Sequence, residues 1–425
     1  MKRRVPFAFA LLVAVASAAV VKNQGYLPFA DAPIHYRSQK LDDPVARLEQ
    51  RLERGETKLR WDQTFGYLPA VLESLRIPVS SQTLVFSKTS FQFNHISPQK
   101  PRALYFNDDV YVGRVQDAKF LEFVSFDPVQ GAIFYILDDN PAGEPRFERS
   151  EVDCVQCHVA PATRGIPGVM MRSVFTRPSG YPAAGLPAFV NGQDTPLADR
   201  WGGWFVTARN APSAHMGNTL TPSQGVKSTL PIGQIVDSKH YLTNSSDIVA
   251  LMVLAHQTQM HNLITEASYR ARIAEYENHD WSDAQQPAEE LVRYLLFANE
   301  IPLTSPIAGD SSFARDFAAR GPRDPAGRSL RDFDLQKRIF KYPCSYLIYS
   351  EDFGALPPKV KQYIYQRLYD ILTGRDQSPL FASLTSEDRR AIFEILVATK
   401  PDLPQEWKQS ARRKPGNSTQ QKGNS

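Results

Sequence analysis

The sequence predicts an α+β fold: an antiparallel β meander that leads to a loop carrying two cysteines, followed by a mainly helical C-terminal region. Two observations predict it. Residues 82–150 hold short runs of aromatic and β-branched residues between turn residues, and residues 245–408 repeat apolar side chains with helical period. The length of 425 residues, with 42% hydrophobic and 22% charged residues, suits a globular protein of two or three domains.

Residues 1–22 are an expected leader. The basic start MKRR is followed by the apolar stretch VPFAFALLVAVASAAVV, and the small residues ASA at positions 16–18 fit a cleavage site. The stretch is barely shorter than a membrane-spanning helix, so an uncleaved N-terminal anchor is the alternative to a cleaved signal peptide. Both interpretations predict a periplasmic or otherwise exported protein, and the second adds attachment to the membrane.

Two short helices are expected ahead of the strands, within residues 23–80. The sequence DPVARLEQRLERGE, residues 43–56, has one charged face and one narrow apolar face. The sequence LPAVLESLRIP places Pro69 in the first helical turn, where its missing N–H group costs little.

Five segments of residues 82–150 predict the strands of the meander. The turn sequences ND, DPVQG and DDNPAGE separate neighbouring segments, so the strands should pair antiparallel and bring the chain directly to the cysteine pair. The segments are TLVFS (83–87), RALYF (102–106), VYVGRV (110–115), FLEFVSF (120–126) and AIFYILDD (132–139).

The stretch SEVDCVQCHVAP holds Cys154 and Cys157, with His158 directly after them. A structural zinc site needs four ligands, usually in two such pairs, and the third cysteine, Cys344, lies in the apolar sequence CSYLIY, which predicts a buried thiol. A thioredoxin-like dithiol belongs to a βαβ unit, which antiparallel strands do not form. A local disulfide is the remaining alternative, and it leaves His158 without a role.

Covalent haem attachment gives all three residues a role. The three-residue spacing places two thiols about one helical turn apart on one face, where they can add to the two vinyl groups of a haem. His158 then supplies the proximal iron ligand. The sequence therefore predicts one covalently attached haem c per chain. The leader agrees, because such attachment normally takes place outside the cytoplasm.

At Cys154, Cys157 and His158 the chain resembles the c-type cytochromes. The resemblance implies a haem iron that exchanges electrons with redox partner proteins. It is specific for this motif alone, because the small electron carriers of that family have the motif near the mature N-terminus. Here about 130 residues separate the leader from the motif and about 265 follow it. The chain is more similar to large exported mono-haem proteins, so the fold of the small carriers is not expected.

Residues 159–244 are rich in glycine, proline and aromatic residues. A long irregular stretch is usually functional or wrapped around something. It either wraps the apolar face of the haem, with Trp201 and Trp204 as walls, or connects two domains while packed on the sheet. We expect residues 23–244 to form a β-rich haem c domain with long loops.

Residues 245–408 predict a helical region that packs on this domain. Its longest helix is expected within residues 245–278, where Val249, Met252 and His256 begin a run of steps of three and four. Two further helices are expected in PPKVKQYIYQRLYDILTG and TSEDRRAIFEILVATKP, the first ending at a glycine and the second starting at a threonine cap.

Residues 409–425 have almost no apolar content and predict a disordered tail. Seven basic side chains belong to the start of the leader and to the tail, and without these the net charge falls from +4 to −3: Lys2, Arg3, Arg4, Arg412, Arg413, Lys414 and Lys422. A nucleic-acid surface needs clustered lysine and arginine on one face, so no nucleic-acid partner is expected.

The motif does not fix the distal ligand of the iron. His215 and Met216 lie 57 and 58 positions after His158, and either side chain can bind iron. We expect His215, with Met216 and His256 as rivals, and an open or water-filled position as the further alternative. His256 is otherwise interpreted as a core histidine. The sequence contains no motif that predicts a second metal site.

Two classes of function remain. Electron transfer requires only the motif, and it is the function we expect; its partners would be redox proteins, among them membrane-bound ones. A haem enzyme, or a protein that binds peroxide or nitrogen oxides, requires an open iron site. No catalytic residue is predicted.

Overall fold

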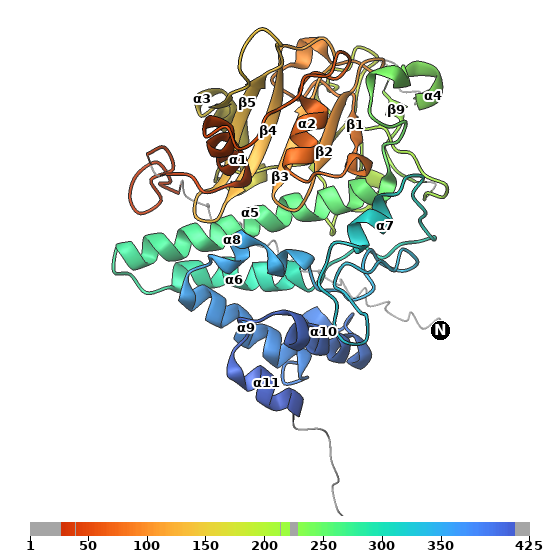
Figure 1. Cartoon of the computed structure of the whole chain (residues 1–425). Coiled ribbons are helices and arrows are strands. Elements are labelled where there is room, and N and C mark those ends of the chain that lie inside the picture. The colour runs from red at the N-terminus through yellow and green to blue at the C-terminus, as the bar shows by residue number, and fades with distance from the viewer. Residues whose placement is uncertain (1–26, 39, 213, 222–227, 413–425) are drawn as a thin grey trace, which may run out of the picture.

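The computed structural model describes residues 27–38, 40–212, 214–221 and 228–412, and Figure 1 shows a sheet-containing half standing on a helical half. The predicted α+β class is confirmed, because one antiparallel sheet occupies the N-terminal half and most helices follow it. The expected leader and the end of the expected tail lie outside the described residues. No described helix combines the length and the apolarity that crossing a membrane requires.

The sheet is a six-stranded antiparallel meander in which every strand pairs with its neighbours in sequence. Its five expected strands are present, with bounds close to the predicted segments. The sixth, β6, was missed because its three residues alternate in no apolar pattern; it pairs with the end of β5. The strands are β1 (Thr83–Val85), β2 (Arg102–Phe106), β3 (Val110–Arg114), β4 (Phe120–Asp127), β5 (Gly131–Asp138) and β6 (Phe147–Arg149).

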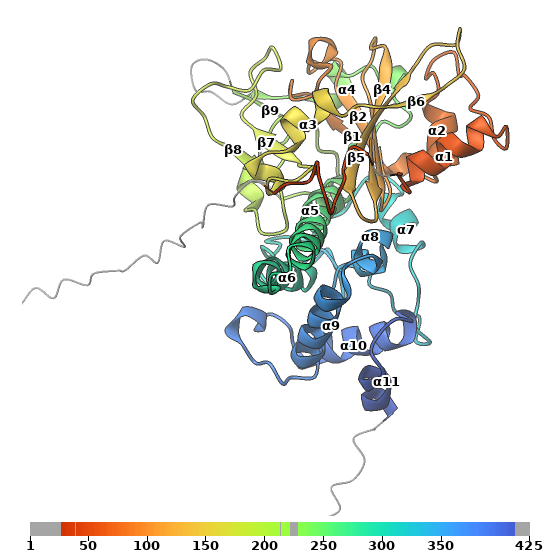
Figure 2. The same cartoon turned by 90° about the vertical axis from the view of Figure 1, so that its left-hand side faces the viewer.

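The two faces of the sheet belong to two different cores, because successive side chains of a strand point to opposite faces. Helices α1 (Pro44–Glu53) and α2 (Leu68–Ser74) cover one face, where Tyr105 and Val112 are buried among their apolar side chains. The opposite face, which carries Tyr111, is turned towards α3 and α5 (Figure 2).

Helix α3 (Val152–His158) follows β6 after two residues and contains the whole cysteine motif. The expected attachment loop is therefore a short helix. The described residues between 159 and 244 are largely irregular. Their strands and their one α-helix are short: β7 (Arg172–Val174), β8 (Ala188–Val190), β9 (Thr219–Leu220), β10 (Ser228–Thr229) and α4 (Ile232–Ile235). Trp201 and Trp204 are both buried in the core between this stretch, the sheet and α5.

Helix α5 (Ile248–Tyr276) is the long helix expected from the sequence, and it runs between the two halves of the molecule (Figure 1). Asp247 caps its start, accepting hydrogen bonds from the backbone N–H groups of Val249 and Ala250. The helix is buried nearly all round, because the sheet half covers one side and the helical half the other.

The helical half packs beneath α5 (Figure 1). It comprises α6 (Ser282–Leu295), α7 (Phe313–Ala318), α8 (Glu351–Gly354), α9 (Pro358–Leu372), α10 (Ser386–Thr399) and α11 (Gln405–Arg412). Helix α11 continues four residues into the segment expected to be disordered from residue 409. The reason is Trp407, which is fully buried and stacks on Phe393 at a ring distance of 5.1 Å.

Candidate functional site

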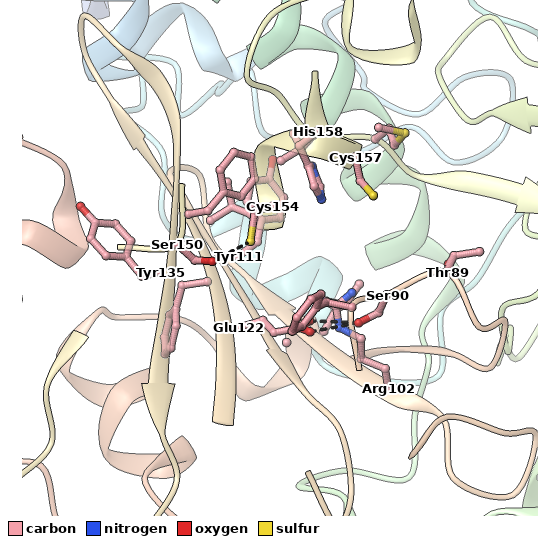
Figure 3. A pocket seen from close by; sticks show the side chains of 18 of the residues that line it. Thr89, Ser90, Arg102, Tyr111, Glu122, Tyr135, Ser150, Cys154, Cys157 and His158 are labelled. Carbon is pink, nitrogen blue, oxygen red and sulfur yellow. Dashed lines mark hydrogen bonds and ion pairs between the residues drawn. The ribbon is translucent and has the colours of Figure 1, made fainter. Parts of the chain in front are cut away.

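One cavity brings the three motif residues together. Cys154, Cys157 and His158 line it from α3, β2 to β5 supply a second wall, and Leu254 of α5 lies among the remaining lining residues. Its volume is about 1190 Å³ when the open space at its mouth is included. We call it the His158 cavity; Figure 3 shows it.

The His158 imidazole points into this cavity (Figure 3). Its Nδ1 atom lies 2.7 Å from the backbone carbonyl oxygen of Gly168, so Nδ1 carries the proton and donates it to that oxygen. The Nε2 atom, with its lone pair, has no hydrogen-bond partner in the described part of the chain. Burial lowers the pKa of His158, which favours the neutral imidazole that binds iron.

The segment that holds His158 is itself clamped by helix α5. The side chain of Asn262 accepts a hydrogen bond from the Val169 backbone N–H at 3.0 Å and donates one to the Val169 carbonyl at 2.7 Å. Gly168 leaves room for this clamp, because a Cβ atom there would collide with Asn262. The imidazole orientation is therefore fixed through two neighbouring backbone residues.

Both motif thiols are free in the structure and are not bonded to each other. The Sγ atom of Cys154 lies 3.5 Å from the Ser150 Oγ atom, and burial raises the pKa of the Cys154 thiol. Cys157 is exposed at the mouth of the cavity. Cys344 is fully buried, as predicted.

The wall opposite His158 is polar at its centre. Arg102 of β2 and Glu122 of β4 form an ion pair of 2.5 Å there, and Figure 3 shows both on the side of the cavity that faces the imidazole. Ser90 and Gln92 donate hydrogen bonds to Glu122 at 3.0 and 3.1 Å. The rest of the lining is mainly apolar and aromatic, as with Phe134, whose ring lies 4.7 Å from that of His158.

These residues fit a covalent haem. Two free thiols stand one helical turn apart beside an imidazole whose Nε2 lone pair is unengaged, and the cavity offers apolar walls for a macrocycle. Cys154 and Cys157 would hold the group and His158 would bind its iron. Among the described residues no group of three or more His, Cys, Asp or Glu side chains is arranged to hold a bare metal ion.

The structure does not bring the expected distal ligand His215, or its rival Met216, to the cavity. His215 packs edge-on against Trp201 at a ring distance of 5.5 Å, and Met216 is buried with its sulfur 3.6 Å from Ser173 Oγ. Neither residue lines the His158 cavity. The structure therefore lends no support to this loop as the source of the distal ligand, and the prediction of His215 stays untested.

His256, the other rival, is a core histidine. Its Nδ1 atom lies 2.8 Å from Gln193 Oε1 and its Nε2 atom 2.8 Å from Ser345 Oγ, so both nitrogens are engaged. The ring stacks on Phe297, and burial lowers the pKa of His256 to about 3. It does not line the cavity either, which corrects the rival prediction and agrees with its interpretation as a core residue.

Among the lining residues that the sequence reasoning missed, four have side chains that can bind a ligand or an iron. Met170 and Met171 line the cavity two and three positions after Gly168, where no motif marks them. Arg102 and Glu122 carried a readable signal, because they are charged residues inside aromatic strand segments and share the strand face of Leu104 and Val124.

No protein-family model, no curated protein and no solved structure matches the chain. The resemblance to the c-type cytochromes remains a matter of Cys154, Cys157 and His158.

Proposed function

We propose that the chain is an exported c-type haem protein that holds one haem through Cys154 and Cys157, with His158 as the axial ligand, and that exchanges electrons with redox partner proteins. The observation that carries the proposal is the convergence of both thiols and the free Nε2 lone pair on one cavity. A bound haem would supply one-electron Fe(II)/Fe(III) chemistry there.

The chain's own residues prepare this site in three ways. The Gly168 carbonyl holds the imidazole in the tautomer that leaves Nε2 free, and it raises the basicity of the ring. Asn262, on the buried helix α5, holds the next backbone residue, Val169, through its N–H and C=O groups. Phe134, Val169 and Leu254 supply apolar surface that excludes water.

A second candidate function is the binding or turnover of a small ligand at an open iron site. The facing wall favours it, because that wall presents the Arg102–Glu122 pair and neither of the histidines expected as distal ligands. Optical and spin-state spectra of the oxidised and reduced holo-protein separate the two functions. Low-spin iron in both states that binds no carbon monoxide supports electron transfer, whereas high-spin iron that binds it supports the second function.

A further inference from the structure

Arg102 lies across the sheet instead of extending into solvent. Leu104, Gly113 and Glu122 are successive partners in one cross-strand row, and Arg102 stands two residues before Leu104 on the same face. Gly113 leaves the surface of β3 open, since a Cβ atom there would collide with the Nη2 and Nε atoms of Arg102. The guanidinium therefore lies over the β3 backbone and reaches Glu122 on β4.

The guanidinium is held firmly in this position. Its Nη2 atom lies 2.5 Å from Glu122 Oε2, and both side chains are largely buried, with 21% and 15% of their surface exposed. Glu122 in turn accepts the hydrogen bonds from Ser90 and Gln92. An anchored arginine of this kind has little freedom to leave the cavity wall.

One donor of this fixed guanidinium is unused. The Nε atom of Arg102 is buried and has no hydrogen-bond partner in the described part of the chain. A buried N–H group without an acceptor is unfavourable, and a buried cationic donor binds an anionic acceptor more strongly than a neutral one. The Nε atom itself is closed to solvent, so an anion inside the cavity would contact the rest of the guanidinium, which lines the cavity with 21% of the side chain exposed.

We propose that Arg102 is the binding residue for a small inorganic anion, of the class of nitrite or azide, on the side of the cavity opposite His158, with Glu122 and Gly113 as its positioning residues. The inference rests on the proposed haem site and names the ligand class of its open face. The anion must be small because it shares the cavity with the haem.

The test measures equilibrium binding of two probes to the holo-protein by optical titration: nitrite to the oxidised form and carbon monoxide to the reduced form. We expect Arg102→Gln to weaken nitrite binding by at least about tenfold, the value of one charge-assisted hydrogen bond, and to change carbon monoxide binding by less than about twofold. Arg102→Lys should recover part of the nitrite affinity. Gly113→Ala should weaken nitrite binding without removing any charge, because it displaces the guanidinium.

The matched control is Arg146→Gln, which removes an exposed guanidinium outside the cavity and should leave both affinities unchanged. Nitrite binding that survives Arg102→Gln overturns the inference. Equal loss of both probes also overturns it, and indicates that Arg102 seats a haem carboxylate instead. If the wild-type protein carries covalent haem but binds neither probe, the inference of an anion site fails and the proposed function stands. If the wild-type protein carries no covalent haem, the proposed function fails as well.

Discussion

The Nδ1 atom of His158 lies 2.7 Å from the backbone carbonyl oxygen of Gly168, ten residues further along the chain. This bond decides which nitrogen of the imidazole keeps its proton, and so which nitrogen faces the cavity. It also ties the end of α3 to helix α5, because Asn262 holds the next backbone unit at Val169. The orientation of the His158 imidazole therefore depends on Asn262, a residue 104 positions away with which His158 shares no direct bond.

Replacing Asn262 by alanine should destabilise the protein and loosen His158. The substitution leaves the buried N–H and C=O groups of Val169 without partners, which should lower the free energy of unfolding by about 2–4 kcal/mol. Urea unfolding followed by circular dichroism measures it. The exposed Asn299→Ala is the control and should stay within about 0.5 kcal/mol of the wild type. If the Asn262 variant were as stable as that control, the hydrogen bonds between Asn262 and Val169 would contribute nothing to the free energy of unfolding.

The sequence predicted the fold class, the sheet and the motif because each has a local signature. Alternating strand residues, turn sequences and the spacing of Cys154, Cys157 and His158 are all legible within a few neighbouring positions. The distal side of the cavity was not predicted, because its residues come from separate strands. Arg102 and Glu122 meet only through the register of three strands, which places Gly113 opposite Glu122 in one row and Arg102 two residues before Leu104 of that row. His215 was expected as a ligand because its imidazole can bind iron. In the structure its ring packs against Trp201, a tertiary contact that the local sequence does not indicate.

Alanine at His215, Met216 or His256 should leave the haem spectrum and its spin state unchanged, because none of these side chains lines the cavity. His256→Ala should nevertheless lower the free energy of unfolding by about 3 kcal/mol, since it removes a buried ring and leaves Gln193 and Ser345 without their partner. Absorption spectra and urea unfolding of the three variants check this. If any one of these variants converted the iron to a high-spin form, that residue would be the distal ligand after all. Met170→Ala and Met171→Ala apply the same test to the two methionines that line the cavity.

Stability should fall as pH rises through about 7. Burial, followed by the nearby carboxylates of Asp108 and Asp352, raises the pKa of Asp109 to about 7. The folded protein therefore binds this proton more tightly than the unfolded chain, so the contribution is present at low pH and is lost as the carboxyl ionises. The side chain of the Asp109→Asn variant cannot ionise. Its free energy of unfolding should therefore exceed that of the wild type by about 1–3 kcal/mol at pH 8, with a smaller difference at pH 5.

Urea unfolding at both pH values measures this difference. The exposed Asp138→Asn serves as the control and should follow the wild type at each pH. A constant difference between Asp109→Asn and the wild type from pH 5 to pH 8 would contradict the assignment of the titration to Asp109.

Removing the haem should lower the melting temperature. The His158 cavity lies between α3, the sheet and α5, so a chain without haem leaves apolar side chains such as Phe134 and Leu254 facing water. Wild-type protein produced without haem-ligation machinery, compared with the holo-protein by differential scanning calorimetry, gives the difference. Equal melting temperatures would mean that the domain is complete without the group.

The most direct test of the central claim is whether the chain holds haem through Cys154 and Cys157. The wild type and the double variant Cys154→Ala with Cys157→Ala are expressed in a periplasm with haem-ligation machinery, and the purified proteins are weighed intact and extracted with acid acetone. We expect the wild type to carry the mass of one haem and to keep its colour through extraction and a denaturing gel, and the double variant to lose both. A wild type without covalent haem, or a double variant that retains it, would contradict the account.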